Sequence, residues 1–412
     1  MRICKIWDAD YPWDVRVEKV AASLSAAGHA VHLVCRNQGR RPREEWTGAF
    51  TIHRLPSIPA LLGPAHTICN FPFPANPFWI HAIAQTVRRI EADVILVRDL
   101  PLALPAAFLG KIHGIPVILD LAENYPAMLE DRFRYTPTTA IDRFARNPAM
   151  ARFAERLAIR LADHIIVVVE ESRERLIRAG VEPDRITIVC NTPRPDRWTL
   201  PLLRQNEGKE LHAIYLGNLD GSRGIDTAIL AVRELANRNR FVRLTVVGDG
   251  PSLTELRDLA RRAGVDDRVA ITGRLPFPEV QSLLARADVG LIPHYATDAW
   301  NSTIPNKLFD YMLAGLPVVV SDAKPAARIV TLEQCGDVFA DRDVRDLARC
   351  LDALGDRASR LDMGRRGQAA VRRQYHWDHD ARALFDVIER VKAAKATSPA
   401  RRKYASALSP GD

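Results

Sequence analysis

A lysine and an aspartate lie three residues apart, as Lys307 and Asp310, within the stretch STIPNKLFDYMLAGLPVVVSD at 302–322. The pattern predicts a polar turn, then a short amphipathic helix with Asp310 on its first turn, and then a buried strand. Free amides at a helix N-terminus, with a basic side chain beside them, favour an anion such as a phosphate. A carboxylate one turn along can accept hydrogen bonds from neighbouring hydroxyl groups. Because a phosphate and two vicinal hydroxyls together characterise a nucleotide, the stretch predicts a nucleotide ligand.

The composition is that of a globular protein with more than one domain. The chain has 412 residues, of which 47% are hydrophobic and 26% charged, and two domains is the expectation for this length. No run of about 18 apolar residues occurs, so no transmembrane helix is expected. The N-terminal residues enter a strand at once and lack the apolar core of a signal peptide, which favours a cytoplasmic location.

The formal net charge of +8 is concentrated at one end of the chain. About half of it lies after Val391, and the remaining segments mix both signs. This distribution argues against a nucleic-acid partner and leaves room for peripheral contact with an anionic membrane surface, at the inner face of the cell membrane. The six cysteines are scattered and include no CxxC pair, so we expect free thiols and neither a disulfide framework nor a metal site.

Short β-branched segments alternate with amphipathic ones along the chain, which predicts an α/β fold with parallel sheets. We expect strands at 2–7, 30–34, 50–54, 94–97, 117–120, 164–169 and 186–190 in the first half, and at 211–216, 242–247, 268–271, 289–293, 317–321 and 336–339 in the second. Expected helices of the first half span 15–27, 77–90, 105–112, 150–162 and 171–179.

The strand pattern restarts after a proline-containing segment, which indicates two Rossmann-like domains facing each other. Ligands of such domains bind at the carboxyl ends of the strands, so the cleft between the domains is the expected site. The expected boundaries are 1–195 for the N-terminal domain, 196–209 for the linker, 210–375 for the C-terminal domain, 376–396 for a last helix and 397–412 for a basic tail that is predicted to be disordered.

Several segments resemble the motifs of one enzyme family. In the second half they are YLGNLDGSRGIDTAI from Tyr215, VVGDGP from Val246, ITGRLPFPEV from Ile271, ADVGLIPH from Ala287 and PNKLFDYMLAGLPVVVSD from Pro305. In the first half, DVRVEKVAASLSAAGHAVHLV, VRDLPLA and PVILDLAENYPAML resemble the acceptor-side domain of the same family. The chain therefore resembles the retaining glycosyltransferases of family 4 (glycosyl transferases group 1), which have the GT-B fold, over nearly its whole length.

The resemblance implies transfer of a sugar from a nucleotide-sugar donor, with retention at the anomeric carbon, to a hydroxyl of a glycan, a lipid-linked or a small-molecule acceptor. Its setting would be polysaccharide or glycoconjugate biosynthesis. The resemblance further implies that the C-terminal domain binds the donor and that the last helix crosses back to pack on the N-terminal domain. It implies no cofactor and no metal, because protein cations and helix amides hold the diphosphate.

The resemblance also assigns roles to individual residues. Arg223 would contact the donor diphosphate, with Lys307 as a second cation and Asp310 at the ribose hydroxyls. Glu123 becomes the candidate for acceptor binding or proton handling, because the histidine found before it in many relatives is Ala122 here. The catalytic candidates are therefore Glu123, Arg223, Lys307 and Asp310. The other donor-side candidates are Gly217, Asn218, Gly248, Gly250, Thr303 and Asn306. The acceptor-side candidates are Asp14, Arg16, Arg98, Asp99, Glu123 and Asn124.

Some of these assignments have a structural alternative. Gly248 and Gly250 fit close approach to a nucleotide, but strand-to-helix turns use glycine in any case. Arg98 and Asp99 could equally form an ordinary surface ion pair.

Departures from the family pattern keep other functions open. The arginine that often follows the first glycine is Asn218 here, and Ser302 and Asp310 stand where many relatives carry two glutamates. One alternative is a non-catalytic subunit that binds a nucleotide sugar without transferring it, and another is a nucleotide-sugar epimerase of the same fold. A dehydrogenase is disfavoured, because no GxGxxG follows the first strand.

Overall fold

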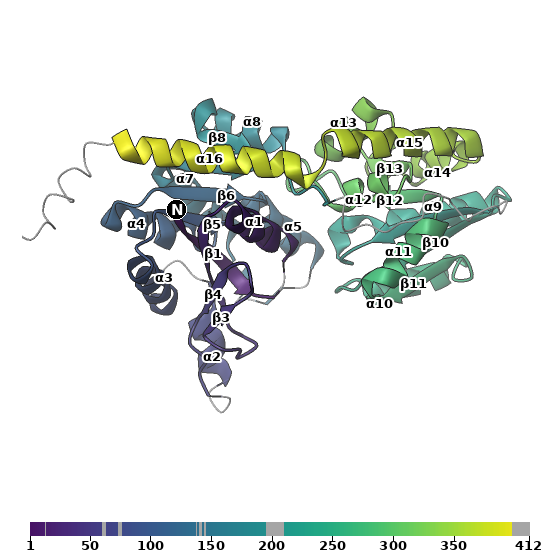
Figure 1. The fold of residues 1–412 in the computed structure, drawn as a ribbon. Helices are drawn as coiled ribbons and strands as arrows, with labels where there is room; N and C mark the ends of the chain where they lie inside the picture. Colours follow the sequence, from purple (N-terminus) through teal and green to yellow (C-terminus); the bar gives the residue numbers. More distant parts are fainter. Residues whose placement is uncertain are drawn as a thin grey trace, which may run out of the picture. The chain divides into compact units, whose positions relative to one another are not determined.

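The computed structural model describes residues 1–12, 14–59, 63–72, 76–136, 138–139, 142–143, 146–194 and 210–397. The predicted linker at 196–209 lies outside these residues, as does the predicted tail except for Thr397. The chain forms two compact units, of which the first contains Met1–Tyr125, Pro148–Cys190 and the residues from Asp380 on, and the second contains Pro126–Asn147 and Asn191–His379 (Figure 1).

The first unit is built on an eight-stranded sheet with the order β3-β4-β2-β1-β5-β6-β7-β8. The strands are β1 (Arg2–Asp10), β2 (Ala30–Arg36), β3 (Glu44–Trp46), β4 (Thr51–Arg54), β5 (Val94–Arg98), β6 (Val117–Leu121), β7 (His164–Val167) and β8 (Ile186–Ile188). All neighbours pair in parallel except β3, which runs antiparallel to β4 at the edge. Strands β5, β6 and β7 are almost continuously buried and mostly apolar, as expected for a parallel sheet covered on both faces.

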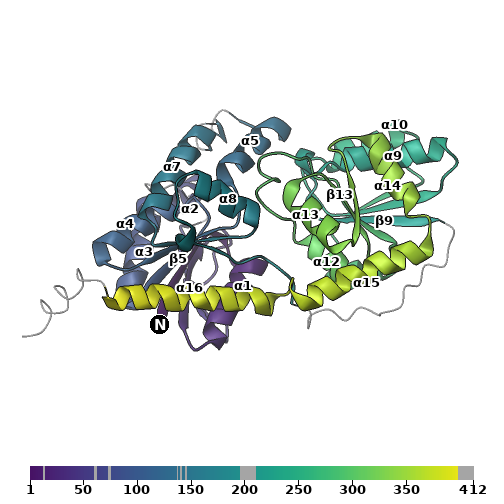
Figure 2. The ribbon, with the colours of Figure 1, turned by 90° about the horizontal axis from the view of Figure 1, so that it is seen from above.

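Helices connect these strands. They are α1 (Val15–Ala26), α2 (Gly63–Asn70), α3 (Pro77–Arg89), α4 (Ala103–His113), α5 (Tyr125–Tyr135), α7 (Pro148–Leu161), α8 (Glu170–Arg178) and the short η2 (Pro183–Arg185). Helices α3, α4 and α7 pack side by side on one face of the first sheet (Figure 2). Helix α5 belongs to the second unit from Pro126 on. Its Asp131 accepts a hydrogen bond of 2.6 Å from Thr297, which is in the same unit.

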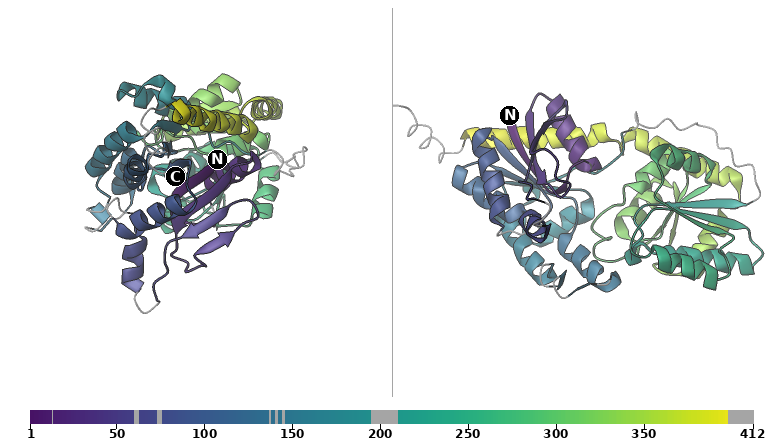
Figure 3. Two further views of the ribbon diagram at one scale, coloured as in Figure 1. Left: turned by 60° about the vertical axis from the view of Figure 1, so that its left-hand side comes forward. Right: turned by 90° about the horizontal axis from the view of Figure 1, so that it is seen from below.

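The second unit has a six-stranded parallel sheet with the order β11-β10-β9-β12-β13-β14. Its strands are β9 (Leu211–Leu216), β10 (Val242–Val247), β11 (Val269–Gly273), β12 (Val289–Ile292), β13 (Val318–Ser321) and β14 (Gly336–Phe339). They fan out with the twist that parallel sheets adopt (Figure 3). The helices are η4 (Gly221–Arg223), α9 (Ile225–Asn237), α10 (Leu253–Arg262), α11 (Phe277–Arg286), α12 (Lys307–Leu313), α13 (Lys324–Glu333), α14 (Val344–Ala353) and α15 (Arg357–Arg373). The last helix, α16 (Trp377–Thr397), begins in the second unit and belongs to the first unit from Asp380 on.

Helices cover both faces of the second sheet. Helix α9 packs against α14 on one face, and α12 packs against α15 on the other (Figure 2). Apolar side chains of α9, β9, β10 and α14 form one continuous hydrophobic core, which includes Tyr215 and Leu351. Because this core fixes the strands in register, it also fixes the loops that leave their carboxyl ends.

The predicted α/β fold with two parallel sheets is confirmed. The strand predictions and the helix predictions of the first half lie within a few residues of the observed elements, but β3, α2 and α5 were not predicted. No bounds were predicted for the second-half helices α9, α10, α11, α13, α14 and α15. Strand β3 has three residues, all exposed, and therefore no alternation of buried and exposed positions to reveal it. The predicted cleft and the predicted domain boundaries stay predictions.

Candidate functional site

The loops at the carboxyl ends of β9, β10 and β12 meet at one edge of the second sheet. These strands are neighbours in a parallel sheet, so the segments that follow them leave at the same edge. They are 217–224 after β9, 248–252 after β10 and 293–306 after β12, and the last of these leads into α12. The predicted donor-side residues all lie in these loops or on the first turn of α12.

Lys307 is the first residue of α12 and lies against two aromatic side chains. Its Nζ is 3.1 Å from Nε2 of His294 and 4.0 Å from the ring centre of Tyr215. Burial, followed by the nearby Arg223, lowers the pKa of Lys307 well below its ordinary value, and this exceeds the opposing effect of Asp220 and Asp310. An anion placed beside this ammonium group would reverse the shift, because an opposite charge favours the charged form.

His294 is the partner that positions Lys307. It follows β12, is 1% exposed, and its Nδ1 has no hydrogen-bond partner among the described residues. Burial, with Lys307 and Arg223 as further causes, lowers the pKa of His294 well below its ordinary value. The imidazole is therefore neutral, and its Nε2 accepts a hydrogen bond from the Lys307 ammonium group.

Arg223 supplies the second cation of this edge. Its Nε donates a hydrogen bond of 2.8 Å to Oδ2 of Asp220, and its guanidinium lies 4.4 Å from the ring centre of Trp300. Asp220 also caps η4 by accepting from the backbone N–H of Ser222 at 3.0 Å. Burial raises the pKa of Asp220, but Arg223 and the Ser222 hydrogen bonds outweigh it and hold that pKa below its usual range. The carboxylate thus orients Arg223 without being available as a proton donor.

Aromatic rings form a wall beneath the two cations. The ring centres of His294 and Trp300 are 4.1 Å apart, and those of His294 and Tyr215 are 6.3 Å apart. Trp300 Nε1 donates to Oγ of Ser222 at 3.3 Å, which ties the loop after β12 to the turn that carries Arg223. Guanidinium and ammonium groups over aromatic faces are favourably placed. The wall therefore supports two like charges that are only partly exposed, since Lys307 is half-buried and the Arg223 side chain is 21% exposed.

Three glycines let the loops approach each other this closely. Gly248 has φ +155°, and a Cβ there would lie 1.7 Å from the carbonyl oxygen of Gly217. Gly217 itself has φ +134°, and a Cβ there would lie 2.9 Å from Nζ of Lys307. Gly250 is similarly confined, since its Cβ would lie 2.4 Å from the carbonyl oxygen of Leu219. This packing gives a structural reason for Gly248 and Gly250, whose contact with a nucleotide stays a prediction.

The remaining donor-side candidates lie around this core of the site. Asn218 is exposed and donates from Nδ2 to Asp220 at 2.9 Å. Thr303 is buried, Asn306 is exposed, and Asp310 is half-buried on the first turn of α12 as predicted. Ser302, at the position where a carboxylate was expected, donates from Oγ to the backbone carbonyl of Asp298 at 2.5 Å. Its hydroxyl is thus committed to the fold of its own loop.

In the first unit, the predicted acceptor-side residues gather at the carboxyl ends of β1, β5 and β6. Arg16 is 1% exposed, and its Nη2 donates to Oδ1 of Asp120 at 2.6 Å. Its Nη1 donates to the backbone carbonyl of Val189 at 3.0 Å. These contacts give Arg16 a buried structural position that links α1, β6 and the segment after β8. A contact of Arg16 with the acceptor stays a prediction.

The neighbouring charges form one network. Asp14 caps α1 by accepting from the backbone N–H of Val17 at 2.9 Å, and it also pairs with Arg98. Asp99 accepts from the backbone N–H of Ala122 at 3.0 Å, and burial raises its pKa to about 6. The Arg98–Asp99 pair, at 3.3 Å, is therefore part of a partly buried network and not an isolated surface pair. Glu123 is half-buried and Asn124 buried just after β6.

His294 and Trp300 were missed by sequence reasoning. His294 ends the motif ADVGLIPH, directly after a buried strand, and this position was the available signal. No sequence signal marks Trp300, because its contact with Ser222 spans 78 residues of sequence.

No helix among the described residues is long and apolar enough to cross a membrane. In the same residues, no group of three or more histidine, cysteine, aspartate or glutamate side chains is arranged to hold a metal ion.

The chain matches two family models. Residues 210–356 match the one described as "Glycosyl transferases group 1", and residues 14–192 match the one described as "Glycosyl transferase 4-like domain". The chain is 28% identical over 336 residues to the 2-deoxystreptamine glucosyltransferase of Streptomyces kanamyceticus, covering 77% of this chain and 83% of that protein. It is 30% identical over 308 residues to a putative colanic acid biosynthesis glycosyltransferase of Escherichia coli, covering 72% of this chain and 68% of that protein.

Solved structures show the same fold. Sucrose-phosphate synthase from Thermosynechococcus elongatus superposes with a TM-score of 0.74 at 18% identity, covering 95% of this chain and 99% of that one. HepE of Anabaena, solved in complex with UDP-glucose, superposes with a TM-score of 0.69 at 16% identity, covering 94% of this chain and 99% of that one.

Proposed function

We propose that this chain, which belongs to the group 1 family of glycosyltransferases, transfers a sugar from a nucleotide-sugar donor to an acceptor hydroxyl with retention at the anomeric carbon. Glycosyltransferase activity in glycoconjugate or polysaccharide biosynthesis follows from the family and its named relatives. The donor class, the stereochemistry and the independence from metal are the proposed part. The observation that carries the donor class is the pair of cations, Lys307 and Arg223, held together on the aromatic wall.

The two cations suit a diphosphate leaving group. When the bond between the anomeric carbon and the phosphate oxygen breaks, negative charge develops on the diphosphate. Lys307 is half-buried and the Arg223 side chain is 21% exposed, so their attraction for that charge is stronger than in bulk solvent. Arg223 is already oriented by Asp220 and Lys307 by His294, so little reorganisation accompanies the reaction. We assign the stabilisation of the leaving group to these two residues.

The proposed proton path uses the donor itself. The acceptor hydroxyl oxygen bonds to the anomeric carbon on the face that the diphosphate leaves, and its proton passes to a phosphate oxygen. Support comes from Ala122, which stands where a histidine base would be expected and has no group that could accept a proton. Glu123, half-buried after β6, is the proposed acceptor-side carboxylate.

The named neighbours support a nucleotide sugar as the donor class. The Anabaena protein was solved in complex with UDP-glucose, and one relative is named a glucosyltransferase. The placement of Asp310 on the first turn of α12, on the same turn as Lys307, fits a contact with ribose hydroxyls next to the diphosphate.

Ser302 favours one competing function. Its hydroxyl is bonded to the Asp298 carbonyl, so the loop offers no carboxylate where many relatives have one. A subunit that binds a nucleotide sugar without transferring it would tolerate this loss. An epimerase of the same fold would instead change the sugar without any acceptor.

One assay separates these functions. The full chain is incubated with UDP-, GDP- and ADP-sugars, with and without an acceptor glycan mixture, and both the nucleoside diphosphate and the sugar products are measured. We expect diphosphate release that depends on the acceptor and a product with the donor's anomeric configuration. Binding of a nucleotide sugar without release would contradict transfer, and a changed sugar formed without acceptor would indicate epimerisation.

A further inference from the structure

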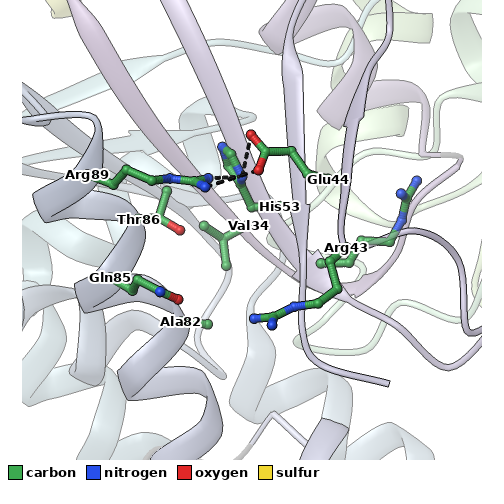
Figure 4. Close-up of a pocket in the computed structure, with 9 residues that line it drawn as sticks. Val34, Arg43, Glu44, His53, Ala82, Gln85, Thr86 and Arg89 are labelled. Atoms are coloured by element: carbon green, nitrogen blue, oxygen red, sulfur yellow. Dashed lines mark hydrogen bonds and ion pairs between the residues drawn. The ribbon is translucent and has the colours of Figure 1, made fainter. Parts of the chain in front are cut away.

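A cavity of about 240 Å³ lies within the first unit, away from every residue assigned above to sugar transfer. Strands β2, β3 and β4 form one side and helix α3 forms the other (Figure 4). In Figure 4, Arg89 and Gln85 extend from the helix, and His53 and Glu44 lie opposite on the strands. Three arginines line the cavity, namely Arg43, Arg54 and Arg89.

The cations of the cavity outnumber its carboxylates. Arg89 pairs with Glu44 at 3.0 Å, and Arg54 pairs with Glu45 at 2.7 Å. Arg43 is exposed and forms no ion pair with any residue that the structure describes. One positive charge is therefore left over. The Glu44 carboxylate is 54% exposed, so its pair with Arg89 is weak and can be exchanged for another anion.

His53 orients Arg89 without adding charge. Burial, and then Arg89 itself, lowers the pKa of His53 to about 4, so the imidazole is neutral near pH 7. Arg89 Nη2 lies 2.7 Å from Nδ1 of His53, and because a guanidinium only donates, Nδ1 must accept. The proton of His53 is then on Nε2, which lies 3.0 Å from Nδ1 of the stacked His32. This chain of imidazoles holds the Arg89 fork in place.

Arg54 adds a donor that the fold does not use. Arg54 is 4% exposed, and its Nε has no hydrogen-bond partner among the described residues. Its Nη1 and Nη2 donate to the carbonyls of Pro42 and Tyr11 at 2.9 and 3.2 Å, which fixes the side chain at the cavity wall. A buried donor without an acceptor lowers the stability of the fold. The cavity wall therefore keeps the rigid Arg54 cation in place despite this loss of stability.

We propose that this cavity binds a single sugar through an anionic group that the sugar carries, either a phosphate monoester or a carboxylate. Guanidinium forks match the planar or trigonal oxygens of both groups. The volume corresponds to roughly eight water molecules and lies below the roughly 300–1,000 Å³ of sites for drug-sized ligands, which suits one charged sugar better than a nucleotide. Gln85 and Thr86 add an amide and a hydroxyl for the sugar's own hydroxyl groups. The inference does not depend on the proposed transfer reaction.

The test is calorimetric titration of the full chain in an Arg223→Gln background, which weakens phosphate binding at the other unit. The probes are glucose 6-phosphate, glucuronate and, as the uncharged control, glucose. We expect at least one charged sugar to bind about tenfold or more tightly than glucose. Tighter binding of glucose 6-phosphate would assign the site to phosphate esters, and tighter binding of glucuronate to carboxylates. If neither charged sugar binds more tightly than glucose, the proposal is wrong.

Three further substitutions locate the binding. Arg89→Gln should weaken it about tenfold or more, while Arg88→Gln, an exposed arginine on the same helix outside the cavity, should leave it unchanged. Glu44→Gln should strengthen binding several-fold, because it removes the carboxylate that competes for Arg89. Thermal unfolding checks that each variant is folded. Equal effects of the Arg89 and Arg88 substitutions, or weaker binding after Glu44→Gln, would overturn the proposal.

Discussion

At the scale of single residues, the second unit holds two half-buried cations against aromatic rings. Lys307 lies against Tyr215 and His294, and Arg223 lies against Trp300. Such an arrangement is unfavourable in the absence of a ligand, as the lowered pKa of Lys307 indicates. Functional sites are where such unfavourable arrangements are typically retained. The residues of this site are therefore better explained by a bound anion than by stability.

Replacing His294 by phenylalanine tests its role as the support of Lys307. His294→Phe keeps a ring against Trp300 but removes the acceptor of the Lys307 hydrogen bond. Because a hydrogen bond to a charged group is worth about 1.5–3 kcal/mol, we expect nucleoside diphosphate affinity to fall about tenfold or more. The melting temperature should change little, since the lost Nδ1 has no partner among the described residues. A large loss of stability with unchanged affinity would show that His294 is only a core residue.

Proton uptake tests the electrostatics of Lys307. Its pKa is lowered in the free protein by burial and by Arg223, and a bound anion raises it again. Binding at a pH between the lowered pKa of Lys307 in the free protein and its raised pKa in the complex should therefore take up protons, and affinity should fall as the pH rises through the lowered pKa. Calorimetry in buffers of different ionisation enthalpy measures the uptake. Lys307→Met should abolish it, and uptake that persists in that variant would assign it to another group.

Only some residues of the donor site could be predicted from the sequence. Arg223 and Lys307 could be predicted because they are basic residues in or next to loops at strand ends, within family-like motifs. His294 could not be distinguished in sequence from a buried core histidine. Trp300 acts through Ser222, and no local pattern encodes a contact across 78 residues. The buried contact of Arg16 with Asp120 was not predicted, because the two residues lie 104 positions apart in the sequence.

At the scale of elements, the turns after β9 and β10 are packed backbone against backbone. The backbone N–H of Gly217 donates to Val247 at 2.9 Å, and that of Leu219 donates to Asp249 at 3.0 Å. The glycines of VVGDGP were predicted as turn or ligand residues. The close packing of the two turns is enough to explain why glycine is required at both positions. The sequence could not decide this, because the close approach involves a second segment about thirty residues earlier in the chain.

Gly248→Ala tests whether this packing shapes the site. Its Cβ would lie 1.7 Å from the Gly217 carbonyl oxygen, so the turn that carries Arg223 must shift. We expect a loss of about 1–3 kcal/mol in the free energy of unfolding and weaker nucleotide binding. Gly264→Ala is the matched control, since Gly264 also has a positive φ, of +65°, but a Cβ there would contact nothing within 4 Å. If both variants bind nucleotide like the unchanged chain, the turn does not shape the site.

The buried pair of Arg16 and Asp120 joins α1 to β6 in the first unit. Both side chains are 1% exposed, so removing one partner leaves an uncompensated buried charge. Arg16→Met should lower the free energy of unfolding by about 3–5 kcal/mol in urea denaturation, and the double variant with Asp120→Leu should lose less. A double variant as unstable as the sum of its two single variants would mean that the pair has no such coupling.

At the scale of the whole molecule, the chain repeats one architecture in two units with different chemistry. Each unit has a mainly parallel sheet with charged loops at strand ends. The overall fold class was readable from the alternation of strand and helix segments, because that periodicity is local. The assignment of Pro126–Asn147 to the second unit was not, since it depends on contacts such as that of Asp131 with Thr297. Two anion sites in one chain also mean that binding to the unmodified protein cannot by itself locate a ligand.

The most direct test of the donor site is therefore a comparison of two arginines in the full chain. UDP, GDP and ADP are titrated calorimetrically into the unmodified protein, into Arg223→Gln and into Arg238→Gln, which alters an exposed arginine at the end of α9. The account predicts that one nucleoside diphosphate binds, that Arg223→Gln weakens it about tenfold or more, and that Arg238→Gln leaves it unchanged. Equal affinity of all three proteins would contradict the assignment of the diphosphate to Arg223 and Lys307.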